Sequence, residues 1–228
     1  MTSDPDACDS LNGGIPMAKK PVRFCVNLLI LILTAIGWFI MMNNISHSPL
    51  ASSGLASLRY FTVLSNLLEG ITAAIFCFLI LTDRQPRWSE LLKLMAASSV
   101  ALTFLTVMLF LGPLYGYPAM FRGANLFFHL IIPVLSMAEY CIVFLPRRFD
   151  RKDKYLAAVP MLLYGCGYLI NIAVNGVGKW PHTNDWYGFL NWGFPVGIVI
   201  FLVLILITMI TAFLLQFICR ITHGSRKR

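Results

Sequence analysis

Charged residues are scarce in this chain of 228 residues: Asp, Glu, Lys and Arg make up 12%, whereas 58% of the residues are hydrophobic. A soluble domain has about 25% charged and 45–50% apolar residues. The shortage of charge therefore excludes an ordinary soluble enzyme, and the high apolar content excludes a disordered chain. The glycines and prolines follow no G-X-Y period, which excludes a collagen-like fold. The composition predicts an all-α polytopic membrane protein.

Metal-binding patterns are also missing. The six cysteines show no C-x-x-C spacing, so we interpret them as small apolar fillers of helix contacts. His47, His129, His182 and Asp185 all fall toward one side of the predicted bundle, but they lack the H-E-x-x-H or H-x-x-E-H spacing of zinc enzymes. A metal site on these four residues is a minor alternative, and we predict neither a metal nor a cofactor.

Six apolar runs are long enough to cross a bilayer as helices. They cover residues 24–42, 60–82, 90–111, 125–145, 155–173 and 193–218. The short connections favour a compact antiparallel bundle. We expect a transmembrane domain over residues 22–219, between a polar, disordered tail at 1–21 and a basic tail at 220–228.

The distribution of basic residues predicts the topology. Lys and Arg number 18 against 10 Asp and Glu, and most of them lie at the termini and in alternate loops. The second inter-span loop is expected to hold Arg84, Arg87 and Lys93, and the fourth holds a longer basic run. By the positive-inside rule this alternation predicts a multi-pass protein of the cell membrane with both termini cytoplasmic. The charge reports topology, so no nucleic-acid partner is predicted.

Three spans concentrate polar residues on one helical face, which must point into the bundle because a polar group facing lipid is costly. The second span carries Thr62, Ser65, Asn66 and Glu69. The fourth carries Asn125, His129, Ser136 and Glu139, and the fifth adds Tyr164, Tyr168, Asn171 and Asn175.

The topology assigns a depth to each polar residue. Thr62 and His129 are both expected about one helical turn below the outer surface, with Glu69 and Ser136 about 10 Å deeper. The sequence thus predicts a polar pocket that opens near the outer leaflet. Pro133 lacks an N–H and clashes with the carbonyl four residues back, which predicts an irregular helix at His129.

The two buried glutamates need an explanation of their own, because a carboxylate inside a membrane must be neutral, paired or hydrated. Glu139 is expected near the inner end, within reach of Arg147 or Lys152. Glu69 lies deeper, with no Lys or Arg expected at its level. We therefore expect Glu69 to be protonated or to face a polar cavity.

Residues 60–68 (YFTVLSNLL) and 125–133 (NLFFHLIIP), together with the six-span layout, resemble a bacterial family of predicted six-helix integral membrane proteins. That family is similar to the androgen-induced-protein family of eukaryotic membrane hydrolases. The resemblance implies that Thr62 and His129 are catalytic, and that the substrates are fatty acid esters of hydroxy fatty acids. We expect membrane lipids as partners.

Threonine is a weak nucleophile that needs a neighbouring base, and a neutral histidine in a dry site suits that role. Asn125, Asn171 or Asn175 is expected to orient the imidazole, and Asn66 or a freed backbone N–H to bind the oxyanion.

Two other functions stay open. One is a small proton-coupled carrier that uses Glu69 and His129 as a titrating pair, although the chain lacks matched Gly or Pro interruptions in its two halves. The other is a non-catalytic lipid-binding bundle, in which Thr62 and Ser65 bond their own helix while His129 and Asn66 link helices.

Overall fold

The computed structural model describes residues 20–43, 45, 53–144, 146, 150, 152–179 and 183–224. This part of the chain is helical and contains no strand. Six of its helices are long and apolar enough to cross a membrane, which confirms the predicted fold class of a multi-pass membrane protein. The tail at 1–19, the last four residues, His47 and His182 lie outside the described residues.

The observed spans begin and end close to the predicted positions. Their bounds are Lys20–Met42, Phe61–Leu81, Arg87–Tyr115, Ala124–Val143, Asp153–Asn175 and Phe194–Thr222. The first two are single helices, α2 (Lys20–Met42) and α3 (Phe61–Leu81), and the last is α11 (Phe194–Gly224). Helix α11 therefore continues into the segment that we predicted as a basic tail.

The other three spans are segmented. The third joins α4 (Arg87–Thr106), the π turn η3 (Val107–Leu111) and α5 (Gly112–Tyr115). The fourth joins α7 (Ala124–Leu126), η4 (Phe127–Ile131), α8 (Ile132–Ala138) and η5 (Glu139–Val143). The fifth joins α9 (Asp153–Leu156) to α10 (Val159–Asn175). Short helices η2 (Gly54–Arg59) and α6 (Tyr117–Met120) precede α3 and α7.

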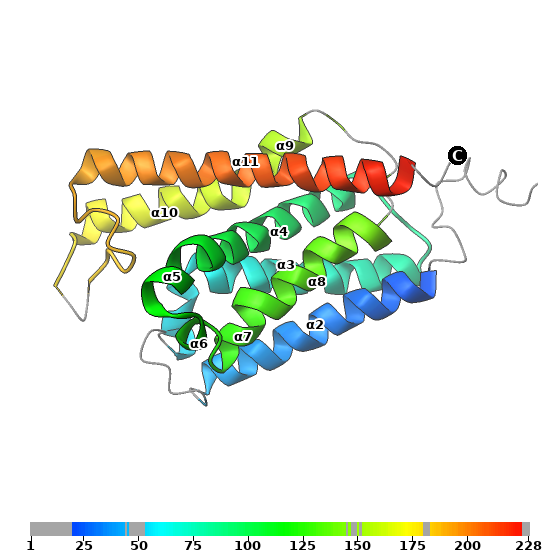
Figure 1. Cartoon of the computed structure of the whole chain (residues 1–228), viewed down its shortest axis with the longest axis horizontal. Coiled ribbons are helices and arrows are strands. Elements are labelled where there is room, and N and C mark those ends of the chain that lie inside the picture. The colour runs from blue at the N-terminus through cyan, green and yellow to red at the C-terminus, as the bar shows by residue number, and fades with distance from the viewer. Residues whose placement is uncertain are drawn as a thin grey trace, which may run out of the picture.

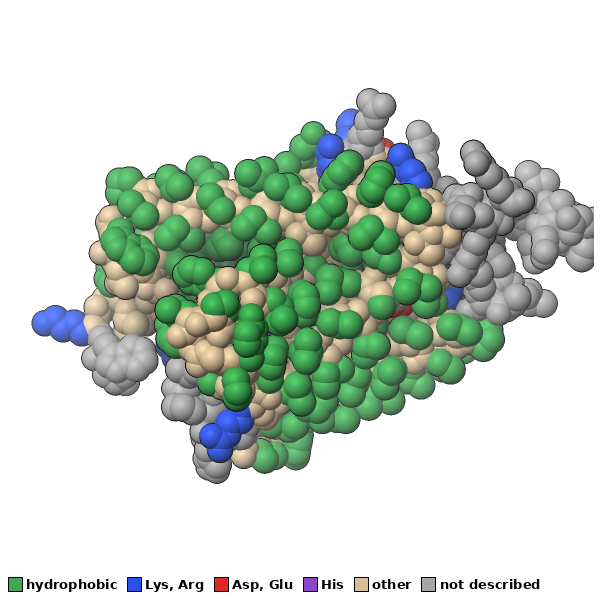
Figure 2. Space-filling model, viewed as in Figure 1, with side chains coloured by type: hydrophobic (Ala, Val, Ile, Leu, Met, Phe, Trp, Pro, Cys, Tyr) green, Lys and Arg blue, Asp and Glu red, His purple; other side chains and the backbone are tan. Residues whose placement is uncertain are grey.

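Helix α4 lies inside the bundle, in contact with α3, α8 and α11, while α2 packs against α3 and the fourth span (Figure 1). The start of α2 and the end of α11 lie at one end, which we call the terminal end (Figure 1). The opposite end, with α6 and the connection from α10 to α11, is the loop end. Hydrophobic side chains cover the length of the bundle between them, and Lys and Arg gather at the two ends (Figure 2).

Glycines allow α2, α3 and the fourth span to approach closely. A Cβ atom at Gly70 of α3 would lie 2.6 Å from the Thr34 side chain of α2. One at Gly37 of α2 would lie 2.8 Å from the ring of Phe128. Small residues at such crossings let membrane helices pack by van der Waals contact. These two crossings fix α3 beside η4.

The irregular backbone that Pro133 predicts is present. Residues Phe127–Ile131 form the π turn η4, and His129 lies at its centre. A second π turn, η5, begins at Glu139. Such turns rotate the residues that follow them relative to an α-helix, and they are frequent at functional sites.

Candidate functional site

His129 is held in one orientation near the loop end. Its side chain is 8% exposed, and its Nδ1 lies 2.7 Å from the backbone carbonyl oxygen of Met120 in α6. A carbonyl only accepts hydrogen bonds, so Nδ1 carries a proton, and in the neutral imidazole Nε2 then keeps its lone pair. The group that orients the imidazole is thus Met120 rather than one of the predicted asparagines.

The predicted asparagines lie elsewhere. Asn171 accepts a hydrogen bond from Asn175 on its own helix, at 2.9 Å, and neither residue bonds His129. Asn125 is buried close to His129 in the chain, yet its side chain bonds no described residue. A carbonyl in a connecting segment has no side-chain signature, which is why sequence patterns missed the role of Met120.

Asn66 connects the first turn of α3 to the turn that holds His129. Its Nδ2 donates to the carbonyl oxygens of Thr62, at 2.8 Å, and Phe128, at 2.9 Å. Thr62 and His129 therefore lie at one level, on adjacent helices, although no hydrogen bond joins their side chains. Because both amide hydrogens of Asn66 are used, this side chain cannot donate to an oxyanion, which corrects that expectation.

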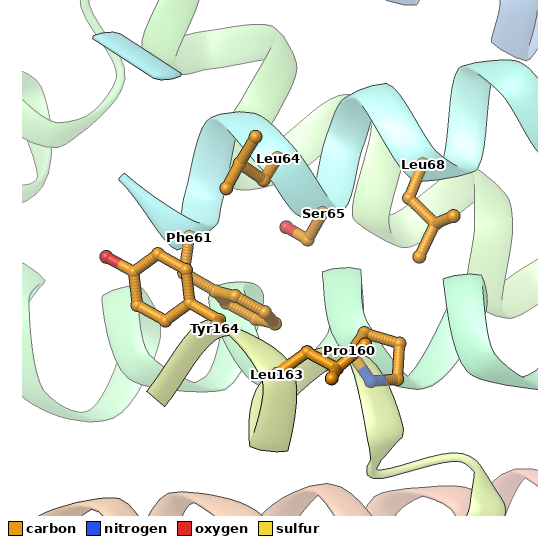
Figure 3. A pocket seen from close by; sticks show the side chains of 7 residues that line it. All are labelled: Phe61, Leu64, Ser65, Leu68, Pro160, Leu163 and Tyr164. Atoms are coloured by element: carbon orange, nitrogen blue, oxygen red, sulfur yellow. The ribbon is translucent and has the colours of Figure 1, made fainter. Parts of the chain in front are cut away.

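Ser65 faces a cavity on the other side of α3. Its Oγ lies 3.0 Å from the Thr62 carbonyl oxygen and 3.1 Å from Oγ1 of Thr103. The cavity has a volume of about 330 Å³ and lies between α3 and α10 (Figure 3). Its lining consists of Phe61, Leu64, Ser65, Leu68, Pro160, Leu163 and Tyr164.

The cavity is apolar and open to the outside of the bundle. Leu64 and Leu163, which line it, are exposed on their helices. The Tyr164 hydroxyl donates to the Arg59 carbonyl oxygen and accepts from Nε1 of Trp186, so it is already occupied. The remaining polar group is the Ser65 hydroxyl. A site of this character and size suits hydrocarbon.

A buried ion cluster lies deeper in the bundle. Lys93 of α4 is fully buried, and its Nζ lies 3.2 Å from Oε1 of Glu69 and 3.1 Å from Oε2 of Glu139. It also donates to Oδ1 of Asn27, at 2.9 Å. The placement of Lys93 in a loop was therefore wrong, and Glu69 does have a cation within reach.

The partner of Glu139 also differs from the prediction. Besides Lys93, Glu139 accepts a hydrogen bond from Nδ2 of Asn27 through Oε1, at 3.0 Å. Lys152 makes no ion pair with it, and Arg147 lies outside the described residues. Glu139 is the first residue of the π turn η5 and is buried in the bundle.

Polar contacts continue from the cluster to the terminal end. Both terminal nitrogens of Arg23 donate to Oε1 of Gln85, at 3.3 Å. Gln85 donates to Glu90 at 3.2 Å, and Glu90 pairs with Arg87 at 3.1 Å. Burying charges requires such pairing, because an isolated ion would cost several kcal/mol.

The connection between α10 and α11 covers the loop end. Asp185 accepts hydrogen bonds from the backbone N–H groups of Phe189 and Leu190, both at 2.9 Å, and from the Tyr168 hydroxyl. The Tyr187 hydroxyl accepts from the N–H of Phe61, at 2.9 Å. Burial raises the pKa of Tyr187 to about 12, so it stays a neutral phenol. Asp185 thus organises a loop that caps the helix end beside Thr62.

Among the described residues, no three His, Cys, Asp or Glu side chains meet as a metal site requires. Comparison of the chain with protein-family models, curated proteins and solved structures found no match.

Proposed function

We propose that this protein is a membrane-embedded hydrolase of lipid esters, with Thr62 as nucleophile and His129 as general base. One observation carries the proposal: a buried imidazole with Nδ1 fixed to the Met120 carbonyl and Nε2 left as an acceptor, beside the helical turn that begins at Thr62. This is the arrangement that a general base requires.

The reaction proceeds in two steps. The Thr62 hydroxyl attacks the ester carbonyl carbon while His129 Nε2 takes its proton. The protonated imidazole then gives this proton to the leaving oxygen, and the alcohol departs. Water hydrolyses the resulting acyl ester with the same histidine as base. The side chains approach each other when substrate binds, as catalytic hydrogen bonds often tighten only in the complex. The positive-inside distribution supports a site near the outer leaflet of the cell membrane, with both termini cytoplasmic.

The cavity between α3 and α10 supplies a place for the acyl chain. It extends from Phe61, the residue before Thr62 in the chain, to Leu68, about 10 Å along the helix at 1.5 Å per residue. Thr62 itself does not line the cavity, so an acyl chain held there passes around the start of α3 to bring its ester to Thr62. A lipid in the membrane reaches it sideways, between the exposed Leu64 and Leu163.

Filling this cavity is expected to impair long substrates selectively. We expect Leu68→Trp to lower kcat/KM for a p-nitrophenyl ester of a long fatty acid by about tenfold while sparing the acetate ester. The long acyl chain loses the contacts of its methylene groups with the cavity, whereas acetate makes no such contacts. Ile71→Trp, on an exposed position of the same helix, is the matched control. Equal losses for both esters would contradict the role of this cavity.

Fluorophosphonate labelling of the purified protein in detergent tests the nucleophile. We expect wild type to be labelled and Thr62→Ala to be unlabelled, because an activated hydroxyl attacks the phosphorus. Thr72→Ala removes a buried hydroxyl that bonds its own helix almost three turns further along α3, and it should label like wild type. Labelling lost in Ser65→Ala but kept in Thr62→Ala would move the nucleophile to Ser65.

A proton-coupled carrier is the second candidate, and the buried ion pair favours it. Lys93 lies between two carboxylates inside the membrane, and intramembrane ionisable residues often mark ion or proton pathways. The titrating group would then be Glu69 with Lys93, because no hydrogen bond links Glu69 to His129. Absence of labelling in folded wild-type protein would make this carrier the function to test.

A further inference from the structure

Six buried side-chain atoms have no hydrogen-bond partner among the described residues, and three of them lie in one row between α3 and α8. These three are Oδ1 of Asn66, Oε2 of Glu69 and Oγ of Ser136. All three residues are 0% exposed. Buried polar groups in native proteins are nearly always satisfied, and those without a protein partner are commonly bonded to internal water.

The orientation of the Asn66 amide is fixed by its neighbours. Both of its partners, the carbonyl oxygens of Thr62 and Phe128, only accept hydrogen bonds. The nitrogen must therefore point at them, and Oδ1 is left as an acceptor that needs a donor. This oxygen lies one turn below Thr62, beside the residue that precedes His129.

Glu69 and Ser136 continue the same row toward the terminal end. Glu69 is three residues from Asn66 on the same face of α3, and its other oxygen is bonded to Lys93. Ser136 lies close to the Glu69 carboxylate from the facing helix α8. The unpartnered atoms thus run from the level of Thr62 to the ion cluster.

We propose that these atoms bind internal water, and that the molecule at Asn66 Oδ1 is the water that hydrolyses the acyl-Thr62 ester. The proposal rests on the proposed function for its second part only. The water donates one hydrogen to Asn66 Oδ1, and its other proton passes to His129 Nε2 as its oxygen bonds the acyl carbon. The bond from that carbon to Thr62 Oγ breaks, and His129 returns the proton to Oγ, which yields a free acid and threonine.

Hydroxyl-radical footprinting tests the water independently of any activity. Radicals formed at a bound water oxidise adjacent side chains, so the fully buried Phe128 of Thr62→Ala protein should be oxidised several-fold faster than Phe201. Phe201 is also buried, but within a cluster of aromatic rings. Oxidation of Phe128 as slow as that of Phe201 would overturn the water site.

A kinetic comparison tests the catalytic role. We expect Asn66→Ala to keep fluorophosphonate labelling but to lower ester turnover about 100-fold. Acyl-Thr62 should accumulate and be visible by mass spectrometry, because a misplaced water slows only the hydrolysis of the acyl ester. Thr72→Ala is again the control. If Asn66→Ala lowers the labelling rate and the turnover rate by the same factor, Asn66 has a structural role alone, and the proposed role is overturned.

These outcomes separate the two proposals. Rapid oxidation of Phe128 in a protein that neither labels nor hydrolyses esters would keep the water site and refute the hydrolase. Labelling that depends on Thr62, together with slow oxidation of Phe128, would keep the hydrolase and refute the water. If Asn66→Ala does not fold, footprinting of the Thr62→Ala protein still decides whether the water is present.

Discussion

Lys93→Met is expected to lower the free energy of unfolding by about 3–5 kcal/mol, because it leaves two buried carboxylates without their cation. Both Glu69 and Glu139 lie within 3.2 Å of its Nζ, and all three side chains are fully buried. The measurement is a denaturation curve of the purified protein in detergent micelles. Lys179→Met, which removes an exposed cation at the loop end, should leave the curve nearly unchanged.

The cause of this loss can be separated from the loss of packing. If the uncompensated carboxylates are responsible, Glu69→Gln and Glu139→Gln added to Lys93→Met should restore a large part of the stability, because all three sites are then neutral. A triple variant no more stable than Lys93→Met would show that the packing of the lysine stem matters instead. A stable Lys93→Met would refute the ion cluster as a stabilising element.

His129→Gln is expected to lower kcat/KM for a p-nitrophenyl fatty acid ester by about 10²–10⁴-fold, the usual contribution of a general base. Glutamine retains an N–H donor for the Met120 carbonyl but has no basic nitrogen. The midpoint of thermal unfolding should therefore stay near that of wild type while activity is lost. The assay is ester hydrolysis in mixed micelles, with unfolding followed on the same preparation.

This substitution also separates the proposed chemistry from a purely structural role of His129. A His129 that only links helices would give a variant with normal hydrolysis, or one whose activity falls together with its unfolding midpoint. Hydrolysis by His129→Gln at the wild-type rate, in folded protein, would exclude His129 as the base. Labelling of Thr62 would then need another activating group.

Part of the site was predictable from helical spacing. The polar stripes of the second and fourth spans placed Thr62 and His129 at one level, and the bond from Asn66 to the Phe128 carbonyl joins those two spans. The same spacing is present in the first span as Arg23, Asn27 and Thr34, and in the third as Ser89, Lys93 and Thr103. Those two polar stripes could have been recognised from the sequence, but Arg23 and Lys93 were interpreted as basic residues outside the membrane that set the topology.

The pairing of Lys93 with Glu69 was not readable from spacing. At 1.5 Å per residue, Glu69 lies about 18 Å from the terminal-end limit of its span and Lys93 about 9 Å from that of the next. These unequal depths argued against a contact. In the structure α3 packs against α4, and the two long side chains cover the difference.

The sequence by itself determined the class of the protein, its six spans and the inward faces of two of them, because a bilayer admits only apolar helices whose polar groups are hidden. Only the tertiary structure decided what each polar group contacts. The Met120 carbonyl at His129, the Phe128 carbonyl at Asn66 and the carboxylates at Lys93 come from other segments of the chain. Such contacts depend on helix rotation, π turns and side-chain reach, which a periodic pattern does not encode.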